Sequence, residues 1–250
     1  MSDEEIQLAD CSVRDDGAVV SARFDDVYFD AADGLAESRA VFIEGSNFPD
    51  RWAANRRWPF TVFETGFGTG LNFLATLSAW RTAETPDGAT LRYFAAEKFP
   101  VSRSVVAEAL GGWGELSAEL AAFLAVYPES ILPGLSRWAV APDVELIYGC
   151  GEVAEIIAAD TPPIDAWLLD GFAPGKNPDM WRAEVFAAMA TRSAPGATIA
   201  TFTAAGVVKR GLRDAGFTVR RRPGHGKKWH RLVGTYSGEI ACVDESNPYD

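Results

Sequence analysis

Short hydrophobic and β-branched runs alternate along most of the chain with segments typical of helices. Strands are predicted over 61–64, 91–96, 144–148, 164–169, 198–202, 217–220 and 229–236. Helices are predicted over 71–80, 101–110, 153–159 and 207–214, and another begins at Asn177-Pro178, where Asn suits the N-cap and Pro the first helical position. Strands that alternate with helices indicate βαβ units and an α/β fold with a mainly parallel sheet covered on both faces.

Two segments interrupt this alternation. Residues 1–60 have the pattern of irregular or short β structure, and residues 111–142 contain one helical stretch near 116–126 followed by loops. We therefore expect an N-terminal extension over 1–60 that packs on and partly covers the site. A Rossmann-like domain over 61–236, with a helical insertion at about 111–142, and a tail over 237–250 complete the expected organisation.

Composition places the chain among folded proteins with an uneven charge distribution. The 250 residues are 48% hydrophobic and carry a formal net charge of −12, which on average repels nucleic acid. Residues 207–231, however, contain nine basic residues and one acidic residue, a formal charge of +8, which leaves −20 on the rest. Such a segment can form a phosphate-binding face on an acidic protein, although solvated helix and strand faces often have the same pattern.

Several protein classes are excluded by what the sequence lacks. It has no apolar run long enough to span a membrane, and its acidic N-terminus has no apolar signal-peptide core. The cysteines, Cys11, Cys150 and Cys242, form no CxxC pair, and there are only two histidines. We therefore expect no membrane association, no bound metal and a reducing, cytoplasmic location.

The first strand ends in a glycine-rich turn. In an open α/β sheet, ligands bind at the carboxyl ends of the strands. The turn contains Gly66, Gly68 and Gly70, whereas a dinucleotide fingerprint would need Gly at Leu71, and a P-loop would need a GK[ST] sequence that is absent. An acid two positions earlier, Glu64, fits the E/DxGxGxG pattern of S-adenosylmethionine enzymes. An ordinary Gly-rich turn between strand and helix is the alternative.

Polar or aromatic residues also follow three later strands. Glu97 can accept hydrogen bonds from both ribose hydroxyls of a nucleoside, and backbone groups around Cys150, or Glu152, can serve an adenine ring. Asp170 ends an apolar strand and is positioned to orient or deprotonate a nucleophile, unless it only caps or braces the loop. Phe172 and Trp181 can stack on a planar substrate, although Trp181 fits a helix-face core position equally well.

Five segments together resemble a known family. They are residues 24–29, 64–74, 97–100, 169–181 and 200–212, and the similarity extends from about 20 to 236. They resemble the methyltransferase domain of the tRNA 5-methylaminomethyl-2-thiouridine biosynthesis family (MnmC type). The resemblance implies a class I S-adenosylmethionine-dependent methyltransferase fold with a seven-stranded sheet. It also implies methylation of the aminomethyl group of 5-aminomethyl-2-thiouridine at the tRNA wobble position.

The family often carries a fused FAD-dependent oxidase domain, which this sequence lacks, so we expect a stand-alone methyltransferase that depends on a separate FAD-dependent oxidase. The resemblance implies that Asp170 is catalytic. The expected cofactor-binding residues are Glu64, Gly66, Gly68, Gly70, Asn72, Glu97, Glu152 and Tyr28, which closes over the site. The expected substrate-binding residues are Phe172, Lys176, Trp181, Lys209, Arg210, Lys227 and Lys228, which contact the base or the anticodon stem-loop.

Two departures from the family pattern affect these expectations. Cys150 stands where the family often has an acid, and the loop Gly224-His225-Gly226 stands where it usually has Gly-Phe-Gly. Two alternatives to the tRNA reaction remain. One is a methyltransferase or aminopropyltransferase for a small amine, and the other is a non-catalytic cofactor-binding partner of a separate flavoprotein.

Overall fold

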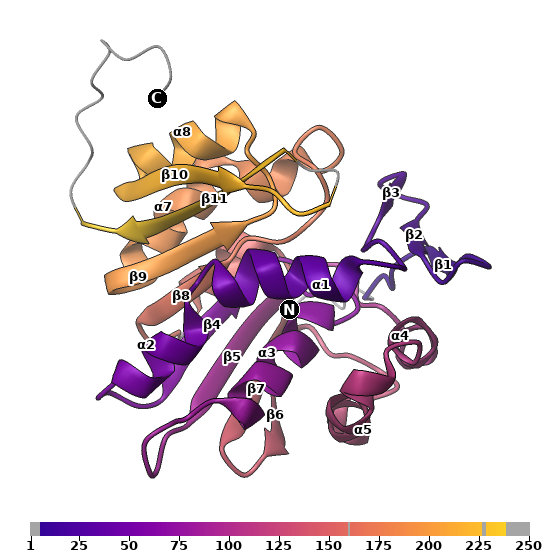
Figure 1. Ribbon diagram of the computed structural model, residues 1–250. Helices are drawn as coiled ribbons and strands as arrows, with labels where there is room; N and C mark the ends of the chain where they lie inside the picture. Colours follow the sequence, from indigo (N-terminus) through magenta and orange to yellow (C-terminus); the bar gives the residue numbers. More distant parts are fainter. Residues whose placement is uncertain (1–5, 160, 227–228, 239–250) are drawn as a thin grey trace.

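The computed structural model describes residues 6–159, 161–226 and 229–238, and its centre is an eight-stranded sheet (Figure 1). The strand order is β10-β11-β9-β8-β4-β5-β7-β6. The strands are β4 (Phe60–Glu64), β5 (Leu91–Glu97), β6 (Gly134–Ala141), β7 (Val144–Cys150), β8 (Ile164–Leu168), β9 (Ser193–Thr201), β10 (Phe217–Pro223) and β11 (His230–Tyr236). The five central strands pair in parallel, whereas β6, β10 and β11 pair antiparallel.

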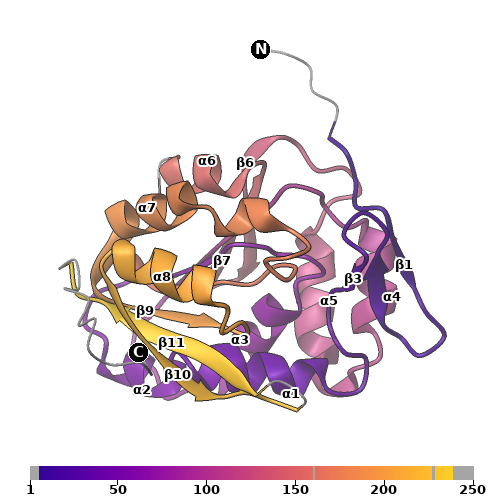
Figure 2. The same cartoon turned by 90° about the horizontal axis from the view of Figure 1, so that it is seen from above.

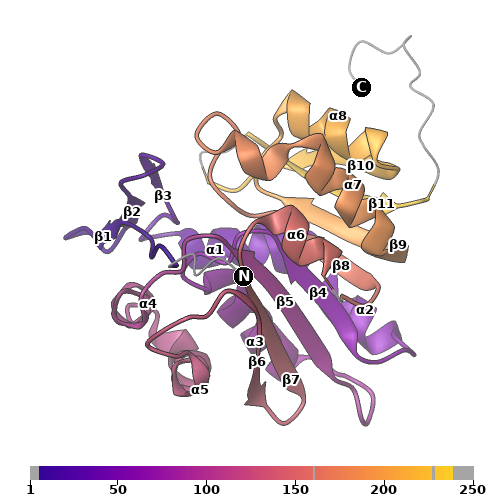
Figure 3. The same ribbon diagram turned by 180° about the vertical axis from the view of Figure 1, so that it is seen from behind.

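Helices cover both faces of the sheet, as Figures 1 and 3 show from opposite sides. One face packs on α1 (Gly34–Ser38), η1 (Arg39–Glu44), α2 (Phe48–Ala54), α3 (Leu71–Thr82), α4 (Arg103–Leu110), η2 (Gly114–Leu116) and α5 (Ser117–Val126). The other face packs on α6 (Val153–Ala158), η3 (Pro178–Trp181), α7 (Ala183–Arg192) and α8 (Gly206–Asp214). Because side chains alternate along a strand, Val62 enters the first core and Phe63 the second.

The predicted α/β class is confirmed, but the predicted count of seven strands is wrong. β6 is an eighth strand, antiparallel to β7, in a segment predicted as loops. Its residues alternate between partly buried and exposed over most of its length, so its sequence lacks the continuous apolar run that marks the central strands. Residues 34–54, predicted as irregular or short β structure, are largely helical. The only strands in the described N-terminal part are β1 (Cys11–Val13), β2 (Val19–Ser21) and β3 (Asp26–Val27).

The predicted helix at Asn177-Pro178 is also shorter than expected. Residues Pro178–Trp181 form a single 3-10 turn, and the Asn177 side chain makes no capping hydrogen bond there. The α-helix that follows, α7, begins only at Ala183. Among the described helices, none is long and apolar enough to cross a membrane.

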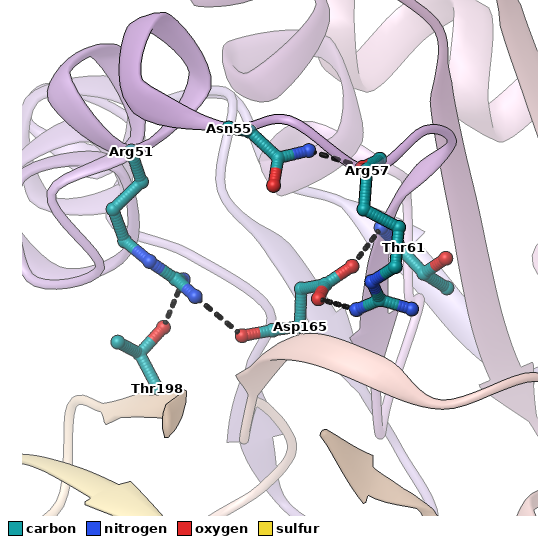
Figure 4. A network of polar contacts seen from close by, with 6 residues as sticks. All are labelled: Arg51, Asn55, Arg57, Thr61, Asp165 and Thr198. Atoms are coloured by element: carbon teal, nitrogen blue, oxygen red, sulfur yellow. Dashed lines mark hydrogen bonds and ion pairs between the residues drawn. The ribbon is translucent and has the colours of Figure 1, made fainter. Parts of the chain in front are cut away.

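A charged network closes the end of the sheet where β4 and β8 begin (Figure 4). The buried carboxylate of Asp165 accepts hydrogen bonds from Arg57 (2.5 Å) and from the backbone N–H of Thr61 (2.8 Å). Arg51 donates to the carbonyl of Asp165 (2.9 Å) and to the hydroxyl of Thr198 (2.7 Å). Since Arg51 belongs to α2, this network fixes that helix to β8 and β9, and Asp165 connects it to the start of β4.

Candidate active site

A cavity of about 810 Å³ lies at the opposite end of the sheet, beyond the carboxyl ends of β4, β5 and β8. Its walls are the glycine turn, the loop that follows β8, the N-terminal segment 23–38, and His225-Gly226. Figure 2 shows the chain from above, with β1 and β3 at the right beside α4, and α1 below the centre. The volume is in the range typical of small-molecule sites.

Two glycines of the turn permit close approaches that a side chain would block. Gly68 has φ +55°, and a Cβ there would lie 2.9 Å from the ring of Tyr28. A Cβ on Gly66 would lie 2.9 Å from the carbonyl oxygen of Asp170. Both glycines line the cavity. Gly70, with φ +88°, instead permits the turn into α3 against the ring of Phe67.

Glu97, at the end of β5, is held in the cavity wall by backbone groups. One carboxylate oxygen accepts the N–H of Gly68 (2.8 Å) and the other accepts the N–H of Phe99 (2.9 Å). Burial raises the pKa of this carboxyl, while the backbone N–H groups act in the opposite direction. Each carboxylate oxygen has further acceptor capacity, so Glu97 can accept additional hydrogen bonds from groups in the cavity.

A single amide connects two carboxylates beside the glycine turn. The Nδ2 of Asn72 donates to Glu64 (2.6 Å) and to Asp170 (2.5 Å). The hydroxyl of Ser38 donates to the Oδ1 of Asn72 (2.6 Å), which fixes the orientation of the amide. Glu64 also accepts from the hydroxyl of Tyr93 (2.9 Å) and is fully buried, so it lies behind the cavity wall. Asp170 and Asn72 line the cavity itself.

The cavity is strongly acidic. Among the described residues, the lysines and arginines in its lining are Arg23 and Lys98, and the carboxylates are Asp26, Asp30, Asp33, Glu37, Glu97, Glu152, Asp170 and Asp179. Behind the wall, burial raises the pKa of the Glu64 carboxyl well above its usual value, and the charge of Asp170 raises it further. This concentration of negative charge favours cationic ligands, such as a sulfonium ion or an ammonium group.

An aromatic cluster joins the N-terminal segment to the loop after β8. The ring of Phe172 stacks on Phe24 at 4.6 Å between centroids and meets the edge of Tyr28 at 5.0 Å. The predicted substrate residue Lys176 is exposed and pairs with the carboxylate of Asp25 (2.6 Å). Asp26 accepts the backbone N–H of Ala173 (3.3 Å). Phe172 and Tyr28 line the cavity, whereas Lys176 lies outside its lining.

Trp181 is predicted either to stack on the substrate or to lie in the core, and the structure places it in the core. Its side chain is buried against Phe202, its Nε1 donates to the carbonyl of Phe172 (3.1 Å), and it does not line the cavity. Glu152 does line the cavity, where it pairs with Lys98.

Of the basic candidates, Lys209 and Arg210 do not line the cavity. Lys209 is almost fully buried in α8, and Arg210 is exposed on the same helix. Lys227 and Lys228 fall outside the described residues. In the part of the chain that the structure describes, no group of His, Cys, Asp and Glu side chains is arranged to hold a metal ion.

Two contributors to the cavity were missed by sequence reasoning. The Nε2 of His225 lies 2.7 Å from the carboxylate of Asp33, and both residues line the cavity. Ser38, which orients Asn72, is the other. These contacts join positions 192 and 34 residues apart, so no local sequence pattern indicates them.

The fold and the site define the class of this protein. A mainly parallel sheet with an antiparallel end, a glycine turn after β4 and an acid, Glu97, at the end of β5 match the class I S-adenosylmethionine-dependent methyltransferase fold. Residues 115–237 match the model of a family described as "S-adenosyl-L-methionine-dependent methyltransferase". The acidic cavity, Glu97 and the glycine turn fit this cationic nucleoside cofactor.

Curated relatives give a more specific similarity. The chain is 47% identical over 220 residues, 87% of its length, to the "tRNA 5-methylaminomethyl-2-thiouridine biosynthesis bifunctional protein MnmC" of Chromohalobacter salexigens, of which it covers 31%. It is 46% identical to the protein of the same name from Caulobacter sp., over 91% of this chain and 38% of the relative. The chain thus spans about a third of the length of these relatives, and it resembles their methyltransferase part.

A solved structure agrees with this result at the level of fold. The crystal structure of MNMC2 from Aquifex aeolicus superposes with a TM-score of 0.69 and 18% identity, over 97% of this chain and 75% of that one.

Proposed function

We propose that this protein transfers a methyl group from S-adenosylmethionine to the primary amine of 5-aminomethyl-2-thiouridine at the tRNA wobble position, in the cytoplasm. The product is 5-methylaminomethyl-2-thiouridine, which the names of the relatives contain. The observation that carries the proposal is Asp170: its carboxylate lines an acidic cavity beside the glycine turn and is held there by Asn72.

The amine must lose a proton before it can react. An alkylammonium with a pKa near 10 is mostly protonated at neutral pH and has no lone pair. In the proposed mechanism, Asp170 binds this ammonium and accepts its proton, directly or through water. When bound, S-adenosylmethionine would supply a methyl group on a positively charged sulfur, which would leave with the electron pair of the S–C bond. Asp170 would keep the amine lone pair free and directed at that methyl group.

The surrounding residues position the two reactants. We assign the cofactor to the glycine turn, Glu97, Asn72, Glu152 and Tyr28, with Glu64 acting from behind the wall through Asn72. Holding amine and methyl in line is worth far more than any single contact, because it removes the entropy loss of a bimolecular encounter. Phe172 is the proposed stacking surface for the extruded uracil ring, since its ring lines the cavity.

We assign the basic segment 207–231 to the phosphates of the anticodon stem-loop. Its candidate contacts are Arg210, which is exposed, and the predicted Lys227 and Lys228; Lys209 is almost fully buried in α8, so we assign it no phosphate. The aminomethyl substrate requires an oxidation that removes a carboxymethyl group, for which we propose an FAD-dependent oxidase as partner.

A methyl-transfer assay tests the reaction directly. Purified protein is incubated with methyl-labelled S-adenosylmethionine and tRNA carrying the aminomethyl wobble group, and the nucleosides are analysed by mass spectrometry. The expected product gains the mass of one labelled methyl group in place of one hydrogen, at that single nucleoside. Equal turnover of the free nucleoside or of a polyamine would instead favour a small-amine enzyme. Cofactor binding without turnover on any of these would favour a non-catalytic partner of a flavoprotein.

A further inference from the structure

The β10–β11 hairpin forms a cationic edge of the molecule. β10 is the outermost strand of the sheet, at the end opposite β6. Its consecutive residues Arg220, Arg221 and Arg222 are all exposed, and no ion pair joins them to any residue that the structure describes. Arg231, opposite Arg222 in the hairpin, is different because it donates to the carbonyls of Ala40 and Val41. Its guanidinium is used in packing η1, whereas the three others face water.

An exposed indole lies at the end of the same hairpin. Trp229 is 87% exposed, whereas Trp52, Trp80, Trp167 and Trp181 are each at most 5% exposed. The carbonyl of Trp229 accepts the N–H of Gly224 (3.1 Å), which places its backbone at the base of the hairpin loop. His225 and Gly226, which belong to the same loop, line the cavity. The hairpin end therefore presents an aromatic ring to solvent close to the cavity mouth.

The chemistry of this edge fits one kind of partner. A flat indole stacks on any nucleobase, and guanidinium groups attract phosphates. The rest of the protein repels a polyanion, since the chain outside 207–231 carries a formal charge of −20. An exposed aromatic ring and exposed arginines on one hairpin of such a protein match single-stranded RNA better than they match an apolar protein surface.

We propose that Trp229 is a stacking platform for a nucleotide that neighbours the modified uridine in the anticodon loop, and that Arg220 and Arg222 hold the adjoining phosphates. The alternation of side chains along β10 places Arg220 and Arg222 on one face of the strand. This inference rests on the proposed function for the identity of the RNA. It adds that the loop is held by its unpaired bases at the cavity mouth while the target base enters the cavity.

Binding of a labelled anticodon stem-loop RNA to the full chain tests the platform. We expect Trp229→Ala to weaken binding by roughly 5- to 100-fold, and Trp229→Phe to retain most of the affinity, because a base stacks on either ring. Leu132→Ala is the matched control, since Leu132 is also a large exposed apolar residue (69%) but follows α5 and precedes β6, at the other edge of the sheet. Far-ultraviolet circular dichroism and S-adenosylmethionine binding monitor the fold.

The salt dependence separates stacking from charge. Losing Arg220 and Arg222 to Gln should reduce the slope of log K against log salt by about 0.7 per phosphate contact, whereas Trp229→Ala should leave the slope unchanged. Arg56→Gln, an exposed arginine at the amino end of the sheet, is the control for the charge change. Binding by Trp229→Ala equal to that of Leu132→Ala would overturn the platform, as would absence of RNA binding by the wild-type protein. RNA binding that depends on Trp229 but leads to no methyl transfer would support the platform and contradict only the proposed reaction.

Discussion

The buried carboxylates at the two ends of the sheet have different partners. At the amino end, Asp165 is surrounded by cations, since it is bonded to Arg57 and lies next to Arg51. At the carboxyl end, Glu64 has the neutral partners Asn72 and Tyr93 and a second acid, Asp170, beside it. Both carboxylates have their hydrogen bonds satisfied, but among the described residues Asp165 accepts from a cation, whereas Glu64 accepts only from neutral groups.

This difference separates a structural role from a functional one. A carboxylate paired with a cation has little remaining attraction for a ligand, and removing one member of such a buried pair costs stability. Uncompensated acids lower stability locally, and the fold retains them where a cationic ligand supplies the missing charge. The comparison predicts that removing acids at the carboxyl end changes chemistry more than stability, and that the reverse holds at the amino end.

The largest expected effect is on catalysis, from Asp170→Ala. We expect methyl transfer to fall by about 10²- to 10⁴-fold, the usual contribution of a positioned acid or base, while cofactor binding is retained. Single-turnover rates and calorimetric S-adenosylmethionine titration measure the two quantities. Asp179→Ala is the matched control, because Asp179 also lines the cavity on the same loop. Near-normal turnover by Asp170→Ala would remove Asp170 from the chemistry.

Asp165→Ala should have the opposite profile. It leaves the buried N–H of Thr61 and the charge of Arg51 without the carboxylate, so we expect the free energy of unfolding to drop by about 1–3 kcal/mol. Urea denaturation measures this loss, with Asp87→Ala, an exposed loop carboxylate, as control. Methyl transfer per folded molecule should remain at the wild-type value. A variant with normal stability and lost activity would contradict the assignment of this end to structure.

The sequence predicts the residues at the strand ends more completely than it predicts the contacts around them. The Glu64 strand, the glycine turn and α3 are one continuous strand-turn-helix unit, and Glu97 and Asp170 end apolar strands, so local patterns predict their common edge. By contrast, the orientation of Asn72 depends on Ser38, and the placement of His225 depends on Asp33, contacts that only the folded chain creates. For Trp181 the sequence favours a stacking role and a core position equally, and its packing against Phe202 shows that it belongs to the core.

The missed elements have a common physical cause. β6 is an edge strand with little burial, and α1, η1 and α2 are short helical segments whose stability comes from packing on α3 and the sheet. Neither kind of element needs a strong periodic pattern of its own.

Glu64→Gln tests whether the acid at the carboxyl end is uncompensated. Burial raises the pKa of Glu64 in the folded protein above 4.5, so the fold favours its protonated form. The corresponding stability is fully present below about pH 4.5 and is lost as the pH rises through the raised value. Gln is neutral at every pH, and it can still accept from Asn72.

We therefore expect Glu64→Gln to gain stability over the wild type as the pH rises from about 4.5, and to match it at lower pH. Urea unfolding between pH 4 and pH 8 measures the difference. Glu119→Gln is the matched control, since this buried carboxyl pairs with Arg81 and should lose stability when neutralised. A difference between Glu64→Gln and the wild type that does not change with pH would mean that Glu64 is as well compensated as Asp165.

The smallest effects are expected at the exposed rim, where Lys176 pairs with Asp25 and joins the loop after β8 to the N-terminal segment. If this pair only joins the two segments, Lys176→Met and Asp25→Asn should produce the same change, at most about fivefold, in the KM for S-adenosylmethionine. If Lys176 instead contacts a phosphate of the tRNA, as the sequence predicts, Lys176→Met alone should weaken tRNA binding and reduce its salt dependence. Asp25→Asn should then bind tRNA at least as well as the wild type, because it releases Lys176 and removes a negative charge. Comparing the two variants in both assays therefore decides between two roles for Lys176. Either it is neutralised by Asp25, as Asp165 is by Arg57, or it binds a phosphate of the tRNA.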